Sequence, residues 1–247
     1  ISFKNSAKMI AEYQNADYIM TLSEFSRQSF LRQGIDEKKL LKVPCGIDTY
    51  YFSLPHRRDD GTKKFRVIFV GLVNLRKGVQ YLLQAWNDLR LPQQDAELIL
   101  VGALHKDMKQ FLKTTPIQNN VVFYGSTTQA DVRRLYRTAS VFVLPSVEDG
   151  FGMVAGEAMA SGLPVVCSDH TGAAEMISDG KEGFVIPACN ADALAEKILW
   201  CYKNRDQAVE MGKLGQKTVE NFSWDRYGDR VYEAYGKIVN EKNSLGE

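Results

Sequence analysis

From Phe65 onward, short apolar runs rich in β-branched residues alternate with stretches of helical periodicity, and this alternation constrains the fold more than any other feature of the chain. Such alternation is typical of a parallel sheet wrapped by helices. Because the runs are apolar throughout, each strand suits burial on both faces. The sequence therefore predicts an α/β fold with a Rossmann-like parallel sheet of about six strands. The expected strands are Arg66–Gly71, Glu97–Val101, Val121–Tyr124, Val141–Leu144, Pro164–Cys167 and Gly183–Ile186.

The chain divides into four expected segments. Residues 1–52 contain a strand, a helix opening near Ser23 and a second strand, and they are interpreted as the tail of a truncated preceding domain. The polar stretch 53–64 lacks apolar periodicity and is expected to be a linker. Residues 65–222 form the main domain. Residues 223–247 are expected to form a helix that packs back on the N-terminal part, because no strand follows to receive its apolar face.

Composition excludes several functional classes. Lys and Arg number 31 against 30 Asp and Glu, mixed along the chain, so no basic stripe suited to nucleic acid arises. The apolar runs are far shorter than the roughly 18 residues of a membrane span. The 4 cysteines contain no CxxC pair, which argues against a zinc site or a disulfide framework and favours a reducing, cytoplasmic setting.

The first candidate site is the loop after the first main-domain strand. In an open parallel sheet, ligands bind beyond the carboxyl ends of the strands. Here Gly71 and Gly78 allow close approach to the backbone, and Arg76 and Lys77 stand beside the start of the next helix. This pattern fits a phosphate site, and taken alone it fits a solvated basic turn equally well.

The second candidate site is the exit of the fourth strand, where glycines lead directly into a helix. Unpaired N–H groups of a first helical turn can donate to sugar hydroxyls or phosphate oxygens. Asp149 precedes this helix and Glu157 lies on it, so both carboxylates are expected to face one crevice and accept from sugar or ribose hydroxyls. The plainer alternative is a dipole-favoured carboxylate and a surface glutamate. The expected ligand-binding positions of this loop are Gly150, Phe151, Gly152, Met153 and Val154.

A third junction, Ser168 to Glu175, again places small residues at the start of a short helix and is expected to close the pocket. His170 lies within it. A lone histidine is more often structural than functional, so both a ligand contact and a structural role remain open for His170. His56 and His105 are expected to be surface residues.

These junctions, in this order and spacing, resemble the donor domain of retaining glycosyltransferase family 4, which has the GT-B fold. The family's Lys-Gly pair at the start of the first helix is matched by Lys77 and Gly78. Its hallmark of two glutamates separated by seven residues around a Gly-Phe-Gly is similar to Asp149 through Glu157. The resemblance covers nearly the whole chain, and the segment Ser23 to Ser26 looks like the family's interdomain connection.

Two positions depart from the family pattern. Leu72 stands where the family usually has a phosphate-binding arginine, and Arg76, with its long side chain and forked guanidinium, is the candidate replacement. Asp149 stands where a glutamate is usual and is shorter by one methylene. Adjacent Glu148 is therefore an alternative carboxylate.

The resemblance implies hexosyl transfer, with retention, from a UDP- or GDP-sugar to an acceptor such as a polysaccharide or glycolipid precursor, with no metal or other cofactor required. Lys77 and Arg76 would stabilise the leaving diphosphate, Asp149 would face the donor sugar and Glu157 would hold the ribose. The acceptor would bind the N-terminal domain, so this chain is expected to bind donor and to be inactive alone. Peripheral association of the full-length enzyme with the inner face of the membrane is also expected.

Two other functions are alternatives to transfer. A GT-B isomerase or hydrolase acting on the sugar nucleotide needs additional acid or base groups, for which His170 and Glu148 are the candidates. A non-catalytic nucleotide-binding module is the other alternative. A dinucleotide dehydrogenase is disfavoured, because no G-x-G-x-x-G follows the first strand.

Overall fold

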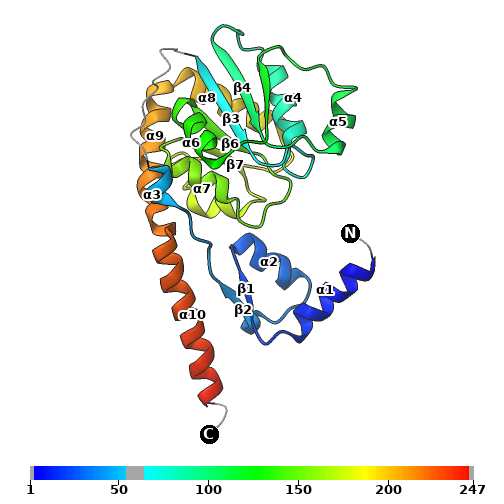
Figure 1. Cartoon of the computed structure of the whole chain (residues 1–247), viewed down its shortest axis with the longest axis vertical. Coiled ribbons are helices and arrows are strands. Elements are labelled where there is room, and N and C mark those ends of the chain that lie inside the picture. The colour runs from blue at the N-terminus through cyan, green and yellow to red at the C-terminus, as the bar shows by residue number, and fades with distance from the viewer. Residues whose placement is uncertain (1–2, 54–63, 245–247) are drawn as a thin grey trace.

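The computed structural model describes residues 3–53 and 64–244. Its main part is a parallel sheet of six strands in the order β5-β4-β3-β6-β7-β8 (Figure 1). Every strand begins and ends within one residue of its predicted bounds, so the predicted α/β fold is confirmed. The strands are β3 (Phe65–Val70), β4 (Ala96–Val101), β5 (Val121–Gly125), β6 (Val141–Leu144), β7 (Val165–Ser168) and β8 (Gly183–Ile186).

Strand order reverses direction between β3 and β6, which are neighbours in the sheet. The chain runs outward from β3 to β5, returns to β6 and then runs outward again to β8. Right-handed crossovers therefore place the helix that follows β3 and the helix that follows β6 on opposite faces, whereas the helix that follows β8 packs against the one that follows β3. The helices are α4 (Val79–Leu89), α5 (Lys106–Leu112), α6 (Gln129–Thr138), α7 (Met153–Ala160), α8 (Ala191–Lys203) and α9 (Arg205–Thr218).

The apolar core lies between the sheet and these helices. Trp86 of α4 is 1% exposed, and its indole N–H donates to the side-chain oxygen of buried Asn120 at 3.0 Å, so the polar tip of this large side chain is satisfied inside the core. Asn190 caps α8, because its side-chain oxygen accepts from Ala193 N at 2.9 Å.

Strand β5 departs from the expected burial on both faces. Val122, Phe123 and Tyr124 are 41%, 39% and 46% exposed. Edge position alone does not explain this, because β8 is the other edge strand and is largely buried against α8 and α9. Among the described residues, β5 has no comparable helix packed on it. An apolar run does not show which strands the helices cover.

The N-terminal segment forms a small unit beside the main sheet (Figure 1). Its strands are parallel and pair from Ile19 with Leu40 to Thr21 with Lys42. Ser23 caps the intervening helix, because its hydroxyl accepts from Ser26 N at 3.0 Å. The elements are α1 (Phe3–Asn15), β1 (Ile19–Thr21), α2 (Glu24–Arg32), η1 (Glu37–Lys39), β2 (Leu40–Lys42) and α3 (Thr49–Phe52).

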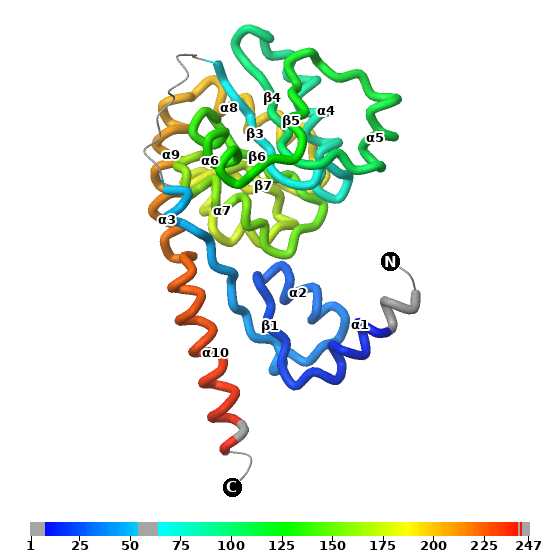
Figure 2. Tube along the Cα trace, in the orientation of Figure 1, coloured from blue at the N-terminus to red at the C-terminus, as the bar shows by residue number. Residues whose placement is uncertain are grey.

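Helix α10 (Trp224–Ser244) follows η3 (Val219–Phe222) and runs away from the main sheet beside the N-terminal unit (Figure 2). Arg230 donates to the carbonyl of Pro44 at 3.3 Å, and Tyr18 donates to the Glu241 carboxylate at 2.7 Å. The helix thus contacts residues before the expected linker. That linker lies almost wholly outside the described residues, as does His56.

Within the described ranges, no helix is both long and apolar enough to cross a bilayer. The four cysteines, Cys45, Cys167, Cys189 and Cys201, are free thiols. Burial raises the pKa of the Cys201 thiol to about 12, so this side chain remains protonated at neutral pH.

Candidate functional site

The loops that follow β3 and β6 meet at the carboxyl end of the sheet, where the strand order reverses. Val147 N donates to the carbonyl of Arg76 at 2.9 Å. Gly78 has a left-handed φ of 70°, and a Cβ at this position would lie 1.8 Å from the carbonyl oxygen of Pro145. Such close backbone contact requires glycine. The arrangement brings the first and second candidate sites together at the place where ligands bind in open α/β sheets.

Lys77 and Asp149 form an ion pair across these two loops, with side chains 16% and 14% exposed. The backbone of Lys77 is fixed by a hydrogen bond, because its N–H donates to the side-chain oxygen of Asn74 at 2.9 Å. Asn74 is 7% exposed. The sequence placed Lys77 and Asp149 in two separate candidate sites, and it gave no indication that they would pair directly.

Arg76 projects from the same loop toward the β6 exit. Its guanidinium donates to the carbonyl oxygen of Glu148 at 3.3 Å, and the residue is otherwise exposed. Leu72, at the position where the family usually has an arginine, is 41% exposed. The structure therefore places the Arg76 guanidinium near Lys77 and Asp149. Arg76 lies at the end of the loop, whereas Leu72 lies at its beginning.

Helix α7 begins directly after this loop. Gly152 precedes it with a left-handed φ of 79°, and a Cβ there would lie 2.8 Å from both the Leu144 side chain and the Thr171 hydroxyl. Met153 is 38% exposed, whereas the ring of Phe151 is 5% exposed and packs in the core. Among the predicted ligand-binding positions of this loop, Phe151 therefore packs into the core and supports the loop.

Glu157 lies on α7, and Gly156 beside it faces Ile47 of the segment that joins the N-terminal unit to the main domain. Burial, together with the nearby Asp48 carboxylate, raises the pKa of Glu157 to about 7. Asp48 itself caps α3 by accepting from Tyr51 N at 2.9 Å. The sequence did not identify Asp48 as a neighbour of Glu157, because the two are more than a hundred positions apart.

The third junction supports the Asp149 loop from the side. Asp149 N donates to the carbonyl of His170 at 3.0 Å, and Gly172 N donates to the carbonyl of Asp149 at 3.1 Å. The His170 ring makes a 3.1 Å contact through Nδ1 with the carbonyl of Val147 and is otherwise exposed. Short helix η2 (Gly172–Met176) follows. This junction therefore braces the second candidate site through backbone hydrogen bonds.

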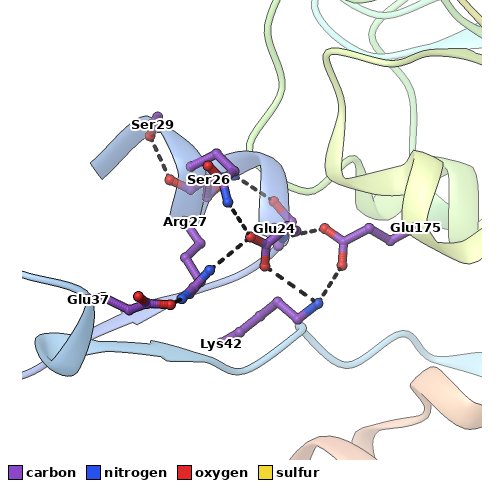
Figure 3. A network of polar contacts seen from close by, with 9 residues as sticks. Glu24, Ser26, Arg27, Ser29, Glu37, Lys42 and Glu175 are labelled. Carbon is purple, nitrogen blue, oxygen red and sulfur yellow. Dashed lines mark hydrogen bonds and ion pairs between the residues drawn. The ribbon is translucent and has the colours of Figure 1, made fainter. Parts of the chain in front are cut away.

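The N-terminal unit reaches the same loop, a contact that the sequence did not reveal. The hydroxyls of Ser23 and Ser26 both donate to the carbonyl oxygen of Gly150, at 2.6 and 3.0 Å. Figure 3 shows the flanking polar network, in which the Glu175 carboxylate accepts from Glu24 N and pairs with Lys42 at 3.1 Å. Sequence signals were present only as the Ser-Glu-Phe-Ser motif.

A concave feature also lies elsewhere on the domain. A cavity of about 500 Å³ is lined by residues of the β8 approach, α8 and α9, including Lys181, Trp200 and Met211. It shares no lining residue with the loops after β3 and β6. Among the described residues, no group of three or more His, Cys, Asp or Glu side chains is arranged to hold a metal ion.

The family model of the glycosyl transferases group 1 matches residues 55–218 of the chain. The chain belongs to this family. The match includes the loops after β3 and β6, the whole of α7 and the third junction. Lys77, Asp149 and Glu157 therefore fall within the family's own domain, whereas Ser23, Ser26 and Asp48 precede it.

Curated relatives agree with this membership, and a solved structure shares the fold. An uncharacterized glycosyltransferase of Methanocaldococcus jannaschii is 32% identical over 96% of the chain and 64% of its own length. A D-inositol 3-phosphate glycosyltransferase of Paenarthrobacter aurescens is 28% identical over 83% of the chain and 53% of its own length. The Anabaena HepE protein, solved in complex with UDP and glucose, superposes with a TM-score of 0.78 at 22% identity, over 91% of the chain and 64% of that structure. The chain thus spans between half and two thirds of the length of these relatives.

Proposed function

We propose that the chain is the donor-binding part of a retaining glycosyltransferase of family 4, which transfers a hexosyl group from a UDP- or GDP-sugar to a polysaccharide or glycolipid precursor. The observation that carries the proposal is the Lys77–Asp149 pair at the reversal point of the sheet. It places one cation and one carboxylate beside the start of α7, where free N–H groups favour anions.

The chemistry follows from these groups. As the bond between the anomeric carbon and the leaving phosphate oxygen breaks, negative charge grows on the diphosphate. Lys77 and Arg76 offset this charge from fixed positions, which is preorganised electrostatic stabilisation. A diphosphate carries more charge than one carboxylate, so it competes with Asp149 for Lys77. Asp149 is then available to accept hydrogen bonds from hydroxyls of the donor sugar.

The nucleoside has its own binding groups in this proposal. Glu157 accepts from the ribose hydroxyls, and the amides of Gly152, Met153 and Val154 hold phosphate oxygens. UDP and glucose bound to the Anabaena neighbour support the choice of a nucleotide-sugar donor. No metal or other cofactor is part of the proposed reaction, since Lys77 and Arg76 supply the positive charge.

The acceptor belongs to the proposal in a different way. Because the chain spans about 53% of the Paenarthrobacter relative and 64% of the Methanocaldococcus relative, we infer that acceptor-binding residues lie in sequence outside this chain. The 247-residue chain alone is therefore proposed to bind donor and to transfer little or no sugar. Peripheral contact of the complete enzyme with a membrane suits a glycolipid acceptor.

Replacing Lys77 by alanine tests the proposal. We expect Lys77→Ala to weaken UDP or GDP binding by about 1 to 3 kcal/mol, because a charged hydrogen bond to phosphate is lost and Asp149 is left to repel the diphosphate. Calorimetric titration with UDP, GDP and ADP measures this change. Lys213→Ala is the matched control, since Lys213 also pairs with a carboxylate, that of Glu210 at 2.7 Å on α9, away from the loops. Equal affinities for the two variants would contradict the proposal.

A further inference from the structure

The N-terminal end of α2 is hydrogen-bonded to the loop that carries Asp149. A carbonyl oxygen has two acceptor positions, and those of Gly150 are occupied by the hydroxyls of Ser23 and Ser26. Gly150 leaves room for this contact, because a Cβ there would lie 3.2 Å from the Ser26 hydroxyl oxygen. The carbonyl next to Asp149 is therefore fixed by side chains from another part of the fold.

The opposite side of the same segment is fixed by the third junction. Asp149 N donates to His170 O, and Asp149 O accepts from Gly172 N. The ring centroids of Phe25 in α2 and His170 lie 5.5 Å apart, so α2 also contacts this second support. The Asp149–Gly150 segment is thus held between the main domain and the N-terminal unit.

Charged residues stabilise the contact between α2 and the loop. Glu175 of η2 accepts from the backbone N–H of Glu24, at the start of α2 where a carboxylate is favoured by the helix dipole (Figure 3). Lys42 of β2 lies 3.1 Å from the same carboxylate and 3.9 Å from that of Glu24. These contacts hold the first turn of α2 against the loop in one orientation.

We infer that Ser23 and Ser26 are positioning residues for Asp149, so that recognition of the donor sugar depends on the docking of the N-terminal unit. The inference rests on the proposed function. The diphosphate and ribose contact Lys77, α7 and Glu157, which Ser26 does not touch. In the proposed function the diphosphate displaces Asp149 from Lys77, so that in the bound state only the sugar contacts Asp149. Loosening the Gly150 carbonyl therefore affects mainly the sugar contribution.

Ser26→Ala is the test, and Ser29→Ala is its matched control. Ser26→Ala keeps the α2 cap, because the cap uses the Ser26 backbone N–H and the Ser23 hydroxyl. Ser29 is exposed on the same helix and its hydroxyl donates within the helix, to Ser26 O at 2.6 Å. We expect Ser26→Ala to weaken binding of UDP-glucose or GDP-mannose about 5-fold, and binding of UDP or GDP less than about 2-fold. Ser29→Ala should change neither.

A double-mutant cycle with Asp149→Asn separates positioning from general support. If Ser26 acts through Asp149, Ser26→Ala has no further effect on sugar-nucleotide affinity in the Asp149→Asn background. Additive losses, or equal losses for nucleoside diphosphate and nucleotide sugar, would overturn the inference while leaving the proposed function intact. Absence of nucleotide binding by the unmodified chain would instead remove the proposed function, and this inference with it.

Discussion

Gly78→Ala is expected to lower the free energy of unfolding by about 4 kcal/mol. Two costs combine: alanine is disfavoured at a φ of 70°, and its Cβ would lie 1.8 Å from the Pro145 carbonyl oxygen. Backbone cannot be relieved by a rotamer change, so the loops after β3 and β6 must separate. Urea unfolding monitored by circular dichroism measures the loss.

Gly180→Ala isolates the contact from the backbone strain. Gly180 has a φ of 80°, yet nothing lies within 4 Å of a Cβ placed there. This control should therefore cost only about 1 kcal/mol, the penalty of the left-handed conformation. If both variants lost the same stability, the close approach of the two loops would be wrong. Since that approach places Lys77 against Asp149, Gly78→Ala should weaken nucleotide binding as well.

Glu157→Gln is expected to stabilise the chain at alkaline pH while weakening nucleotide binding. The pKa of Glu157 is about 7 in the folded chain against a reference value of 4.5. Between these values the folded chain binds the proton more tightly, so the stabilisation is complete below pH 4.5 and is lost as pH rises through about 7. A difference of this size corresponds to on the order of 3 kcal/mol.

Glutamine cannot titrate, so the stability of Glu157→Gln should not fall as pH rises through about 7 for this reason. Between pH 5 and pH 8, the free energy of unfolding of Glu157→Gln should rise by on the order of 2 kcal/mol relative to that of the unmodified chain. Asp48→Asn, which removes the neighbouring carboxylate, should shift the stability curve part of the way. Urea unfolding at a series of pH values measures both, and parallel curves for all three proteins would show that Glu157 is not perturbed.

Binding should move in the opposite direction. Ribose hydroxyls donate to an ionised carboxylate, so nucleoside diphosphate affinity should rise with pH through about 7 and lose this dependence in Glu157→Gln. A bare sugar phosphate has no ribose and should bind both proteins equally. Functional carboxylates typically lower the stability of the folded chain at working pH and strengthen ligand binding.

The fold was predictable because its signals are local. Strands β3 to β8 are mainly apolar runs, with Arg66 and Glu97 as the charged exceptions, and Asn190 caps α8 in the manner its position suggests. The covering of a strand by helices is not local, and for this reason the exposure of β5 escaped prediction. Strand order depends on how crossovers are arranged in space, which apolar periodicity does not encode.

The candidate site was predictable in membership but not in pairing. Glycines and charged residues after parallel strands identified the loops of Lys77 and Asp149, because the carboxyl ends of such strands share one edge. Direct pairing of these two side chains depends on the docking of one loop on the other at Gly78. Ser26 and Asp48 approach the site from segments far away in sequence, and no spacing rule connects them to it.

A crystal structure of the chain with a nucleoside diphosphate, UDP or GDP according to which one binds, tests the central claim most directly. The account predicts diphosphate oxygens at hydrogen-bond distance from the Lys77 ammonium and the first amides of α7, with the ribose hydroxyls at the Glu157 carboxylate. A nucleotide seated instead in the cavity beside Trp200 and Met211, with the Lys77–Asp149 pair undisturbed, would contradict it.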